Sequence, residues 1–139
     1  MKKIIVTTHG NLAAELIHTS RMFTSYDELT SVGLEIGGDL QAFKQNLSNE
    51  ILENPYNEIL ILVDLAGGTP FNTAIQIIHE YKGLKKIEIL TGVNLPMLLE
   101  ALLSEKELEI SSLREKIIKA GKEGIKNFSK VINDKEGGE

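Results

Sequence analysis

The feature that most constrains the fold is a run of five apolar residues, Ile59-Leu60-Ile61-Leu62-Val63. A strand with one face in water alternates apolar and polar side chains, and this run has no such alternation. Strands that are apolar on both faces are typical of the centre of a parallel sheet with helices packed on each side. The run therefore predicts a layered α/β domain built around a buried strand.

Strand-like and helix-like patterns alternate along the whole chain, as such a domain requires. We expect strands over 3–7, 31–36, 59–63 and 86–91, and helices over 11–23, 39–51, 70–81, 96–103 and 111–128. Asn11, Asp39 and Thr69 are the expected N-caps of three of these helices. Residues 128–132 fit either the end of the last helix or a short antiparallel strand at the sheet edge, and the pattern leaves both open.

This order of elements predicts a doubly wound α/β domain, with a mainly parallel sheet, right-handed crossovers and helices on both faces. If the strand order is 2-1-3-4, as in flavodoxin-like folds, the order reverses between the first and third strands. Ligands of such domains bind at this point, outside the carboxyl ends of the strands. The segments TTHG at 7–10 and VDLAGGTPFN at 63–72 follow these two strands, so we expect the site there.

Composition and charge exclude several classes of protein. The 139 residues suit one domain, predicted over 1–133, with a frayed tail over 134–139. The 15 basic and 20 acidic residues give a formal net charge of −5, which argues against a nucleic-acid partner. The absence of cysteine excludes disulfides and thiolate metal sites and fits a reducing compartment. No apolar run has the length of a signal-peptide core or a membrane span, so we expect a cytoplasmic protein without membrane insertion.

A histidine and an aspartate follow the two strands that flank the reversal point. His9 could be a turn residue bonded to a backbone carbonyl, a metal ligand or a nucleophile, and Asp64 could be a turn residue. If the two lie side by side, the carboxylate accepts a hydrogen bond from imidazole Nδ1 and leaves the Nε2 lone pair exposed. It also stabilises the cation that forms when Nε2 attacks. The pair therefore favours an activated histidine nucleophile.

The segment GGTPFN at 67–72 has the pattern of an anion site at the start of a helix. We expect Thr69 to be the N-cap and Pro70 the first helical residue, where its missing N–H costs nothing. Gly67 and Gly68 allow backbone amides to approach a ligand closely. The segment therefore predicts a phosphate-binding site.

The amides of Phe71 and Asn72, in the first turn of this helix, are expected to be unpaired and close to the positive end of the helix dipole. Such a terminus favours phosphate, and His9 beside it predicts phosphoryl transfer through a phosphohistidine. The P-loop and dinucleotide-binding motifs are missing, and no acidic cluster would hold the Mg²⁺ of a nucleotide-dependent kinase. We therefore expect no cofactor and a phosphoryl group that is supplied by another protein.

The other two histidines, His18 and His79, lie within expected helices and have no acidic or glycine-rich partner pattern. We expect both to be structural or solvent-facing. The three histidines lack a short ligand spacing such as H-x-x-x-H, so no metal site is predicted.

The chain resembles the IIA component of the mannose/fructose/sorbose family of the bacterial sugar phosphotransferase system. The matching segments are IIVTTHG around His9, LVDLAGGTPFN over 62–72, TGVNLPMLLE over 91–100 and KAGKEGIK over 119–126. They follow the order and spacing of the family over essentially the whole chain. The resemblance implies a doubly wound fold and a homodimer, often with a swapped C-terminal strand, which would lie near 128–132 here.

The resemblance also implies roles for individual residues and partners. His9 would take a phosphoryl group from the histidine-containing phosphocarrier protein and pass it to a IIB component, which phosphorylates a sugar entering through the membrane components. Asp64 would orient the imidazole, and Thr69 would help to bind the phosphoryl group. Many members have serine in place of Thr69, and the hydroxyl is kept. The chain ends without the linker that joins IIA to IIB in some relatives, so IIB is expected as a separate protein.

Two alternatives remain open on the sequence. The phosphotransferase subunit of a dihydroxyacetone kinase shares this fold and a histidine after the first strand, although GVNLP and GGTPFN favour the sugar-transport family. A non-catalytic flavodoxin-like module that binds a small anion or a flavin is the second alternative. The aromatic content of 5%, with no tryptophan, argues against stacking of a flavin ring.

Overall fold

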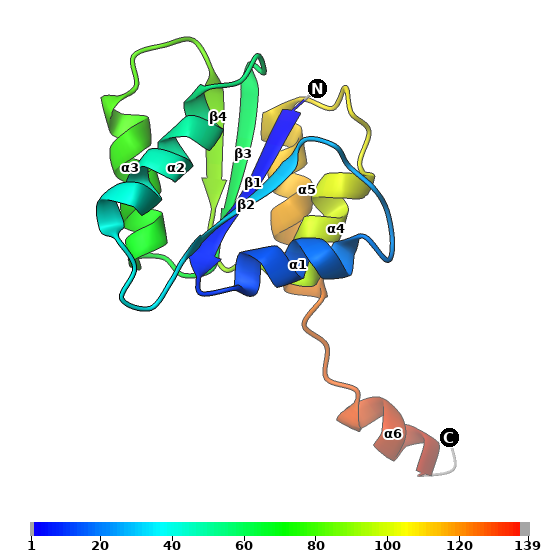
Figure 1. Cartoon of the computed structure of the whole chain (residues 1–139). Coiled ribbons are helices and arrows are strands. Elements are labelled where there is room, and N and C mark those ends of the chain that lie inside the picture. The colour runs from blue at the N-terminus through cyan, green and yellow to red at the C-terminus, as the bar shows by residue number, and fades with distance from the viewer. Residues whose placement is uncertain (1, 137–139) are drawn as a thin grey trace.

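A parallel sheet of four strands in the order β2-β1-β3-β4 forms the centre of the molecule (Figure 1). The computed structural model describes residues 2–136 of the chain. Its strands are β1 (Lys2–His9), β2 (Leu29–Leu34), β3 (Glu58–Val63) and β4 (Lys86–Leu90). In the parallel register, Thr7 of β1 lies opposite Val32 of β2 and Val63 of β3. The predicted strand order and the doubly wound class are confirmed.

Five helices cover the two faces of the sheet, as Figure 1 shows. They are α1 (Leu12–Ser20), α2 (Leu40–Leu52), α3 (Thr69–Glu80), α4 (Leu95–Leu103) and α5 (Ile110–Glu123), and the described chain ends with α6 (Ser129–Glu136). On one face α1, α4 and α5 pack on sheet residues such as Ile4 and Leu60, and on the other α2 and α3 pack on Ile5 and Ile61. Successive strand residues point to opposite faces, so β1 and β3 contribute to both cores. None of the described helices is both long and apolar enough to cross a lipid bilayer.

The central strand β3 is as buried as its composition predicts. All residues from Ile59 to Val63 have 0% exposure. Each large aliphatic side chain buried in this way stabilises the fold by about 1.5–3 kcal/mol relative to an exposed one. β1, beside it, is buried from Lys2 to Thr8, and only its last residue, His9, is exposed. The sheet therefore holds His9 at the end of a rigid, buried strand.

The start of α1 differs from the prediction. Asn11 occupies the N-cap position, but its side chain makes no capping hydrogen bond. Its φ of −93° and ψ of 6° are not the extended conformation from which a capping side chain reaches the first turn. Instead, the buried hydroxyl of Thr8 accepts a hydrogen bond from the Ala13 amide at 2.8 Å. Asp39 does cap α2, as predicted, by accepting hydrogen bonds from two amides of the first turn.

The chain leaves the domain after α5. This helix ends at Glu123 rather than at the expected residue 128. Gly124 lies against Pro96 in the first turn of α4, and beyond this contact the chain runs away from the sheet (Figure 1). Phe128 is consequently exposed. The helical spacing of apolar residues in the sequence therefore continues past the point where the core ends.

A short helix, α6, occupies the region for which the sequence left both a helix end and an edge strand open. The strand over 128–132 is not formed, because Ser129–Glu136 is helical and stands apart from the sheet (Figure 1). The helix also extends into the expected frayed tail, whose last residues, 137–139, lie outside the described residues.

Candidate functional site

His9 is the last residue of β1 and lies at the carboxyl edge of the sheet, where the sequence predicted the site. Its side chain is 46% exposed. Gly10 then turns the chain towards α1 with a φ of +58°, a conformation that favours glycine. The Gly10 amide donates to the Leu34 carbonyl at 2.7 Å, which ties this turn to the end of β2. A fixed turn therefore presents the imidazole to solvent.

Asp64 is the first residue after β3 and lies beside His9. Its Oδ2 atom is 2.8 Å from His9 Nδ1 and accepts a hydrogen bond from the His9 amide at 3.0 Å. Its Oδ1 atom accepts from the Leu65 amide at 2.9 Å. Only 11% of the Asp64 side chain is exposed. The structure thus brings together the two residues that the sequence singled out. Sequence reasoning missed the two backbone donors, because neither depends on the type of side chain.

The surrounding hydrogen bonds determine the ionisation of Asp64. Partial burial by itself would raise the pKa of this carboxyl, but the hydrogen bonds from the His9 side chain and from the His9 and Leu65 amides outweigh burial. The pKa of Asp64 is therefore lower than its ordinary value of 3.8. An ionised carboxylate can only accept hydrogen bonds, so Nδ1 of a neutral imidazole carries the proton and Nε2 has the free lone pair.

The start of α3 lies against the imidazole of His9. A Cβ atom on Gly68 would be 2.7 Å from Cε1 of the ring. Gly68, not Thr69, is the N-cap of α3, and the helix start has no side-chain capping bond. The prediction of Thr69 as the N-cap is therefore wrong by one position, and Pro70 is the second helical residue rather than the first. The extended backbone of Gly68 (φ −78°, ψ 171°) provides the N-cap conformation one residue earlier.

The backbone amides at this helix start are only partly free. The Asn72 amide donates to the Gly68 carbonyl at 2.9 Å, so the expectation that it is unpaired is wrong. The helix begins earlier than predicted, which gives this amide an acceptor one turn back. In the described part of the chain, the Thr69 and Phe71 amides have no acceptor, and Pro70 has no N–H. These two amides and the exposed Thr69 hydroxyl lie at the positive end of the helix dipole, which suits an anion.

Gly67 and the side chain of Asn72 shape the turn that precedes α3. Gly67 has a φ of +83°, which favours glycine. The side-chain amide of Asn72 donates to the Gly67 carbonyl at 3.1 Å. This contact fixes the turn in place. The segment 67–72 is thus held by its own hydrogen bonds in a geometry that leaves two donors for a ligand.

The two remaining histidines lie away from this pair. His18 on α1 is 82% exposed, and His79 near the end of α3 is also exposed. Both are solvent-facing, which is one of the two alternatives that the sequence left open. His18 does have an acidic neighbour, because its Nδ1 atom lies 3.6 Å from a carboxylate oxygen of Glu15 one turn earlier on α1. Among residues 2–136, no group of His, Asp and Glu side chains is arranged to hold a metal ion.

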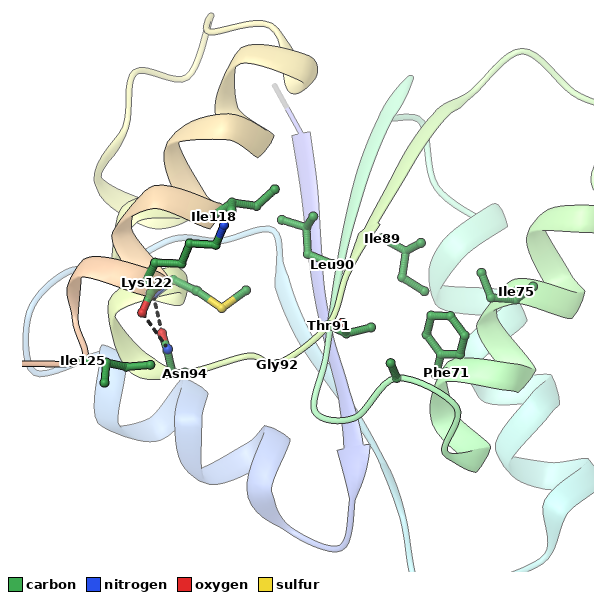
Figure 2. Close-up of a pocket in the computed structure, with 13 residues that line it drawn as sticks. Phe71, Ile75, Ile89, Leu90, Thr91, Gly92, Asn94, Ile118, Lys122 and Ile125 are labelled. Carbon is green, nitrogen blue, oxygen red and sulfur yellow. Dashed lines mark hydrogen bonds between the residues drawn. The ribbon is translucent and has the colours of Figure 1, made fainter.

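Sequence reasoning missed a cavity of about 610 Å³ that adjoins the site. It follows the outer edge of β4, with Phe71 and Ile75 of α3 on one side and Ile118 and Lys122 of α5 on the other (Figure 2). Neither His9 nor Asp64 lines it, but Ala66 of the loop before α3 does. The sequence feature that could have indicated this cavity is the mainly apolar β4, KIEIL, because the structure places this strand at an open edge of the sheet.

The loops at the carboxyl edge carry acidic but no basic residues. These loops are the segments 9–12, 34–40, 64–69 and 91–95. They contain Glu35, Asp39 and Asp64, and neither lysine nor arginine. The same loops and adjoining helix starts expose four aliphatic side chains, Leu12, Ile36, Leu40 and Leu65. A basic side chain that the structure places beside these loops is Lys122 of α5, which lines the cavity with Ala66 and Thr91.

Comparison with known proteins places this chain in one family. The family model described as PTS system fructose IIA component matches residues 3–118. The fructose-specific EIIA component of the phosphotransferase system of Bacillus subtilis (strain 168) is 32% identical over 115 residues, which are 81% of this chain and 77% of that protein. The mannose-specific EIIAB component of Escherichia coli (strain K12) is 28% identical over 126 residues. This match covers 88% of the chain but 38% of that longer protein.

Solved structures agree with the sequence comparison. The crystal structure of a phosphotransferase system component EIIA from Streptococcus agalactiae superposes with a TM-score of 0.85 at 35% sequence identity. The superposition covers 94% of this chain and 99% of that one. The fold around the His9–Asp64 pair is therefore the fold of these EIIA proteins.

Proposed function

Because the chain belongs to the PTS system fructose IIA component family, we propose that it carries a phosphoryl group on His9 during sugar uptake. His9 receives the group from the histidine-containing phosphocarrier protein and passes it to a IIB component, both in the cytoplasm. The observation that carries this proposal is the 2.8 Å contact between His9 Nδ1 and Asp64 Oδ2. It leaves the Nε2 lone pair of an exposed imidazole free to react.

The proposed reaction exchanges a phosphoryl group between two imidazoles. His9 Nε2 attacks the phosphorus atom of the donor phosphohistidine, and a new N–P bond forms. The N–P bond of the donor breaks, and its electron pair returns to the donor imidazole. The His9 Nδ1 proton stays on the ring, hydrogen-bonded to Asp64, whose negative charge stabilises the cationic character of the phosphorylated ring. Transfer to IIB is the same exchange with His9 as the donor.

The start of α3 supports the phosphoryl group in this proposal. The amides of Thr69 and Phe71 and the Thr69 hydroxyl are the available donors, and they lie at the positive end of the helix dipole. Gly67 and Gly68 have no side chains that would keep the phosphoryl group away from these donors. The role of Asn72 is to hold the turn through its side chain, not to donate its amide.

The surroundings of His9 favour a protein donor over a free anion. The loops at the carboxyl edge have no lysine or arginine to neutralise a phosphoryl group, and their acidic residues repel small anions. The exposed aliphatic side chains of Leu12, Ile36, Leu40 and Leu65 provide apolar area that a partner protein can bury. A partner protein can supply the cationic groups that these loops lack and can bury their exposed aliphatic side chains.

A second copy of the chain is the proposed occupant of the cavity beside β4. Within the described residues β4 pairs with β3 alone, so its outer edge has N–H and C=O groups free for another strand. The C-terminal region exposes four apolar side chains that such a pairing would bury, Ile125, Phe128, Val131 and Ile132. A mass in solution of twice that of the chain, measured by light scattering, is expected, and the mass of a monomer would contradict the dimer.

Labelling with phosphoenolpyruvate tests the carrier function. Incubated with the general phosphotransferase proteins and labelled phosphoenolpyruvate, the chain is expected to gain one acid-labile, base-stable phosphoryl group on His9. His9→Ala should abolish the label, while His18→Ala and His79→Ala serve as matched controls and should retain it. An unlabelled wild-type chain, or label that persists in His9→Ala, would exclude the proposal.

A further inference from the structure

Two adjacent glycines precede α3, and they are glycines for different physical reasons. Gly67 has a φ of +83°, and a Cβ atom built on it would have no atom within 4 Å apart from those of its chain neighbours. Gly68 has an ordinary extended backbone, with φ −78° and ψ 171°, that any residue can adopt. A Cβ on Gly68, however, would lie 2.7 Å from Cε1 and 3.3 Å from Nε2 of His9. The positive φ angle favours glycine at position 67. At position 68 the backbone allows any residue, and glycine is required because the His9 ring leaves no room for a side chain.

We propose that Gly68 is a positioning residue for the phosphoryl acceptor, because the His9 ring occupies the volume that a side chain at position 68 would need. The inference rests on the proposed carrier function and adds to it the means by which the ring is held. Asp64 binds the ring through Nδ1 at 2.8 Å, and Gly68 lies against the Cε1–Nε2 edge. The imidazole is thus fixed from two sides.

The same contact sets where Nε2 lies. Gly68 is the N-cap of α3, so a ring seated on it has Nε2 next to the helix start that carries the free amides of Thr69 and Phe71. A phosphoryl group on Nε2 then lies close to those donors without further movement. A side chain at position 68 would separate the imidazole from this helix start.

The ring, rather than the backbone, is expected to move when a side chain is added. The atoms that the Cβ would meet belong to the His9 side chain, which is 46% exposed and can rotate into solvent. That rotation breaks the hydrogen bond between Nδ1 and Asp64. Gly68→Ala should therefore fold, lose the fixed Nδ1–H tautomer of His9, and accept phosphoryl groups about 100-fold more slowly, as expected for a misplacement on the order of 1 Å.

The decisive measurement is the ¹⁵N NMR signal of the His9 imidazole in the unphosphorylated chain, under conditions where the ring is neutral. The wild type is expected to show one tautomer, protonated at Nδ1, and Gly68→Ala a mixture. Gly67→Ala is the matched control, because its Cβ enters open space: it should lower the thermal midpoint through backbone strain and keep the tautomer. A wild-type tautomer in Gly68→Ala, or the same change in both variants, would overturn the inference.

A second readout covers the case in which Gly68→Ala is too unstable for spectroscopy. In a His9→Ala background the space for a Cβ is vacant, so adding Gly68→Ala should then lower the thermal midpoint much less than it does in the wild type. Equal shifts in the two backgrounds would overturn the inference. Neither readout needs a phosphoryl donor, so a failure of this inference is distinguishable from a failure of the carrier function.

Discussion

The two ends of the parallel sheet differ in how their polar groups are satisfied. At the amino end, Lys2 and Lys3 are nearly buried and both have partners: Lys2 donates to the Lys106 carbonyl at 3.1 Å, and Lys3 pairs with Glu50. At the carboxyl end, backbone amides of α3 have no acceptor in the described chain, and the imidazole of His9 is half-exposed. One end of the molecule is closed by its own hydrogen bonds, and the other has donors free for a ligand.

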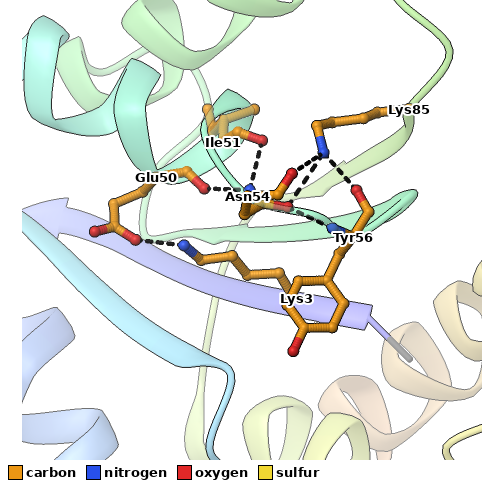
Figure 3. Close-up of polar contacts among 6 residues, drawn as sticks. All are labelled: Lys3, Glu50, Ile51, Asn54, Tyr56 and Lys85. Carbon is orange, nitrogen blue, oxygen red and sulfur yellow. Dashed lines mark hydrogen bonds and ion pairs between the residues drawn. The ribbon is translucent and has the colours of Figure 1, made fainter.

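Figure 3 shows a group of connected hydrogen bonds at the amino end. The Lys85 ammonium donates to both oxygens of Asn54 and to the Tyr56 carbonyl. The side-chain amide of Asn54 in turn donates to the carbonyls of Glu50 and Ile51, the last turn of α2. These contacts join the last turn of α2, the loop between α2 and β3, and the loop before β4. Paired polar groups here stabilise the fold, which allows the opposite edge to keep unpaired groups for binding.

The largest effect is expected when one charge is removed at the carboxyl end, where the polar groups are free for a ligand. We expect Asp64→Asn to keep the fold and to slow phosphoryl transfer to His9 by a factor on the order of 10³, because an asparagine amide can donate to Nδ1 and stabilise the wrong tautomer. Initial rates of labelling with the phosphocarrier protein measure the effect.

Asp27→Asn is the matched control for Asp64→Asn. It makes the same chemical change at an exposed position in the loop between α1 and β2, at the other end of the sheet. Its rate should equal that of the wild type. An Asp64→Asn variant as fast as this control would show that the carboxylate does not orient the imidazole.

The contact between His9 and Asp64 can be predicted from the sequence, because each step of the prediction depends on residue type and strand order alone. An apolar run at 59–63 indicates a central strand, and a central parallel strand beside the first one brings their carboxyl ends together. His9 and Asp64 are the polar residues at those two ends, so their contact follows from the topology.

The first residue of α3 and the last residue of α5 are not predicted from the sequence, because both depend on three-dimensional contacts. The N-cap of α3 falls on Gly68 rather than Thr69, because the turn conformation and not the side-chain preference decides where the helix begins. That shift by one residue gives the Asn72 amide an acceptor. The end of α5 likewise depends on where α4 begins, since Gly124 lies against Pro96 and the core ends there. Periodicity along the chain contains no information on either contact.

A change of intermediate size is expected at the amino end. Glu50→Gln removes the ionic partner of the Lys3 ammonium, whose side chain is 8% exposed. Because the Glu50 side chain is itself 36% exposed and water can partly replace it, we expect a loss of about 1–2 kcal/mol in the free energy of unfolding, with unchanged phosphoryl transfer. Urea denaturation measures the loss.

Glu53→Gln, at an exposed position just after α2, is the control for Glu50→Gln. It should change stability by less than about 0.5 kcal/mol. If Glu50→Gln slowed phosphoryl transfer as strongly as Asp64→Asn, the two ends of the sheet would not be independent, and the contrast between them would be wrong.

The smallest expected effect is the contribution of Asp64 to stability as the pH falls. The pKa of Asp64 is lower in the folded protein than its ordinary value of 3.8, so the unfolded chain takes up a proton first. The ionised Asp64 carboxylate therefore makes its full contribution to the free energy of unfolding at pH values well above 3.8. This contribution is lost as the pH falls through the lowered pKa of the folded protein. The difference in unfolding free energy between the wild type and Asp64→Asn isolates it from the other carboxyls, and we expect a change on the order of 1 kcal/mol or less. If the wild type instead gained stability relative to Asp64→Asn as the pH fell towards 3.8, burial, not the hydrogen bonds from His9 and Leu65, would govern this carboxylate. In that case the carboxyl end would lack the fixed charge on which the orientation of the imidazole depends.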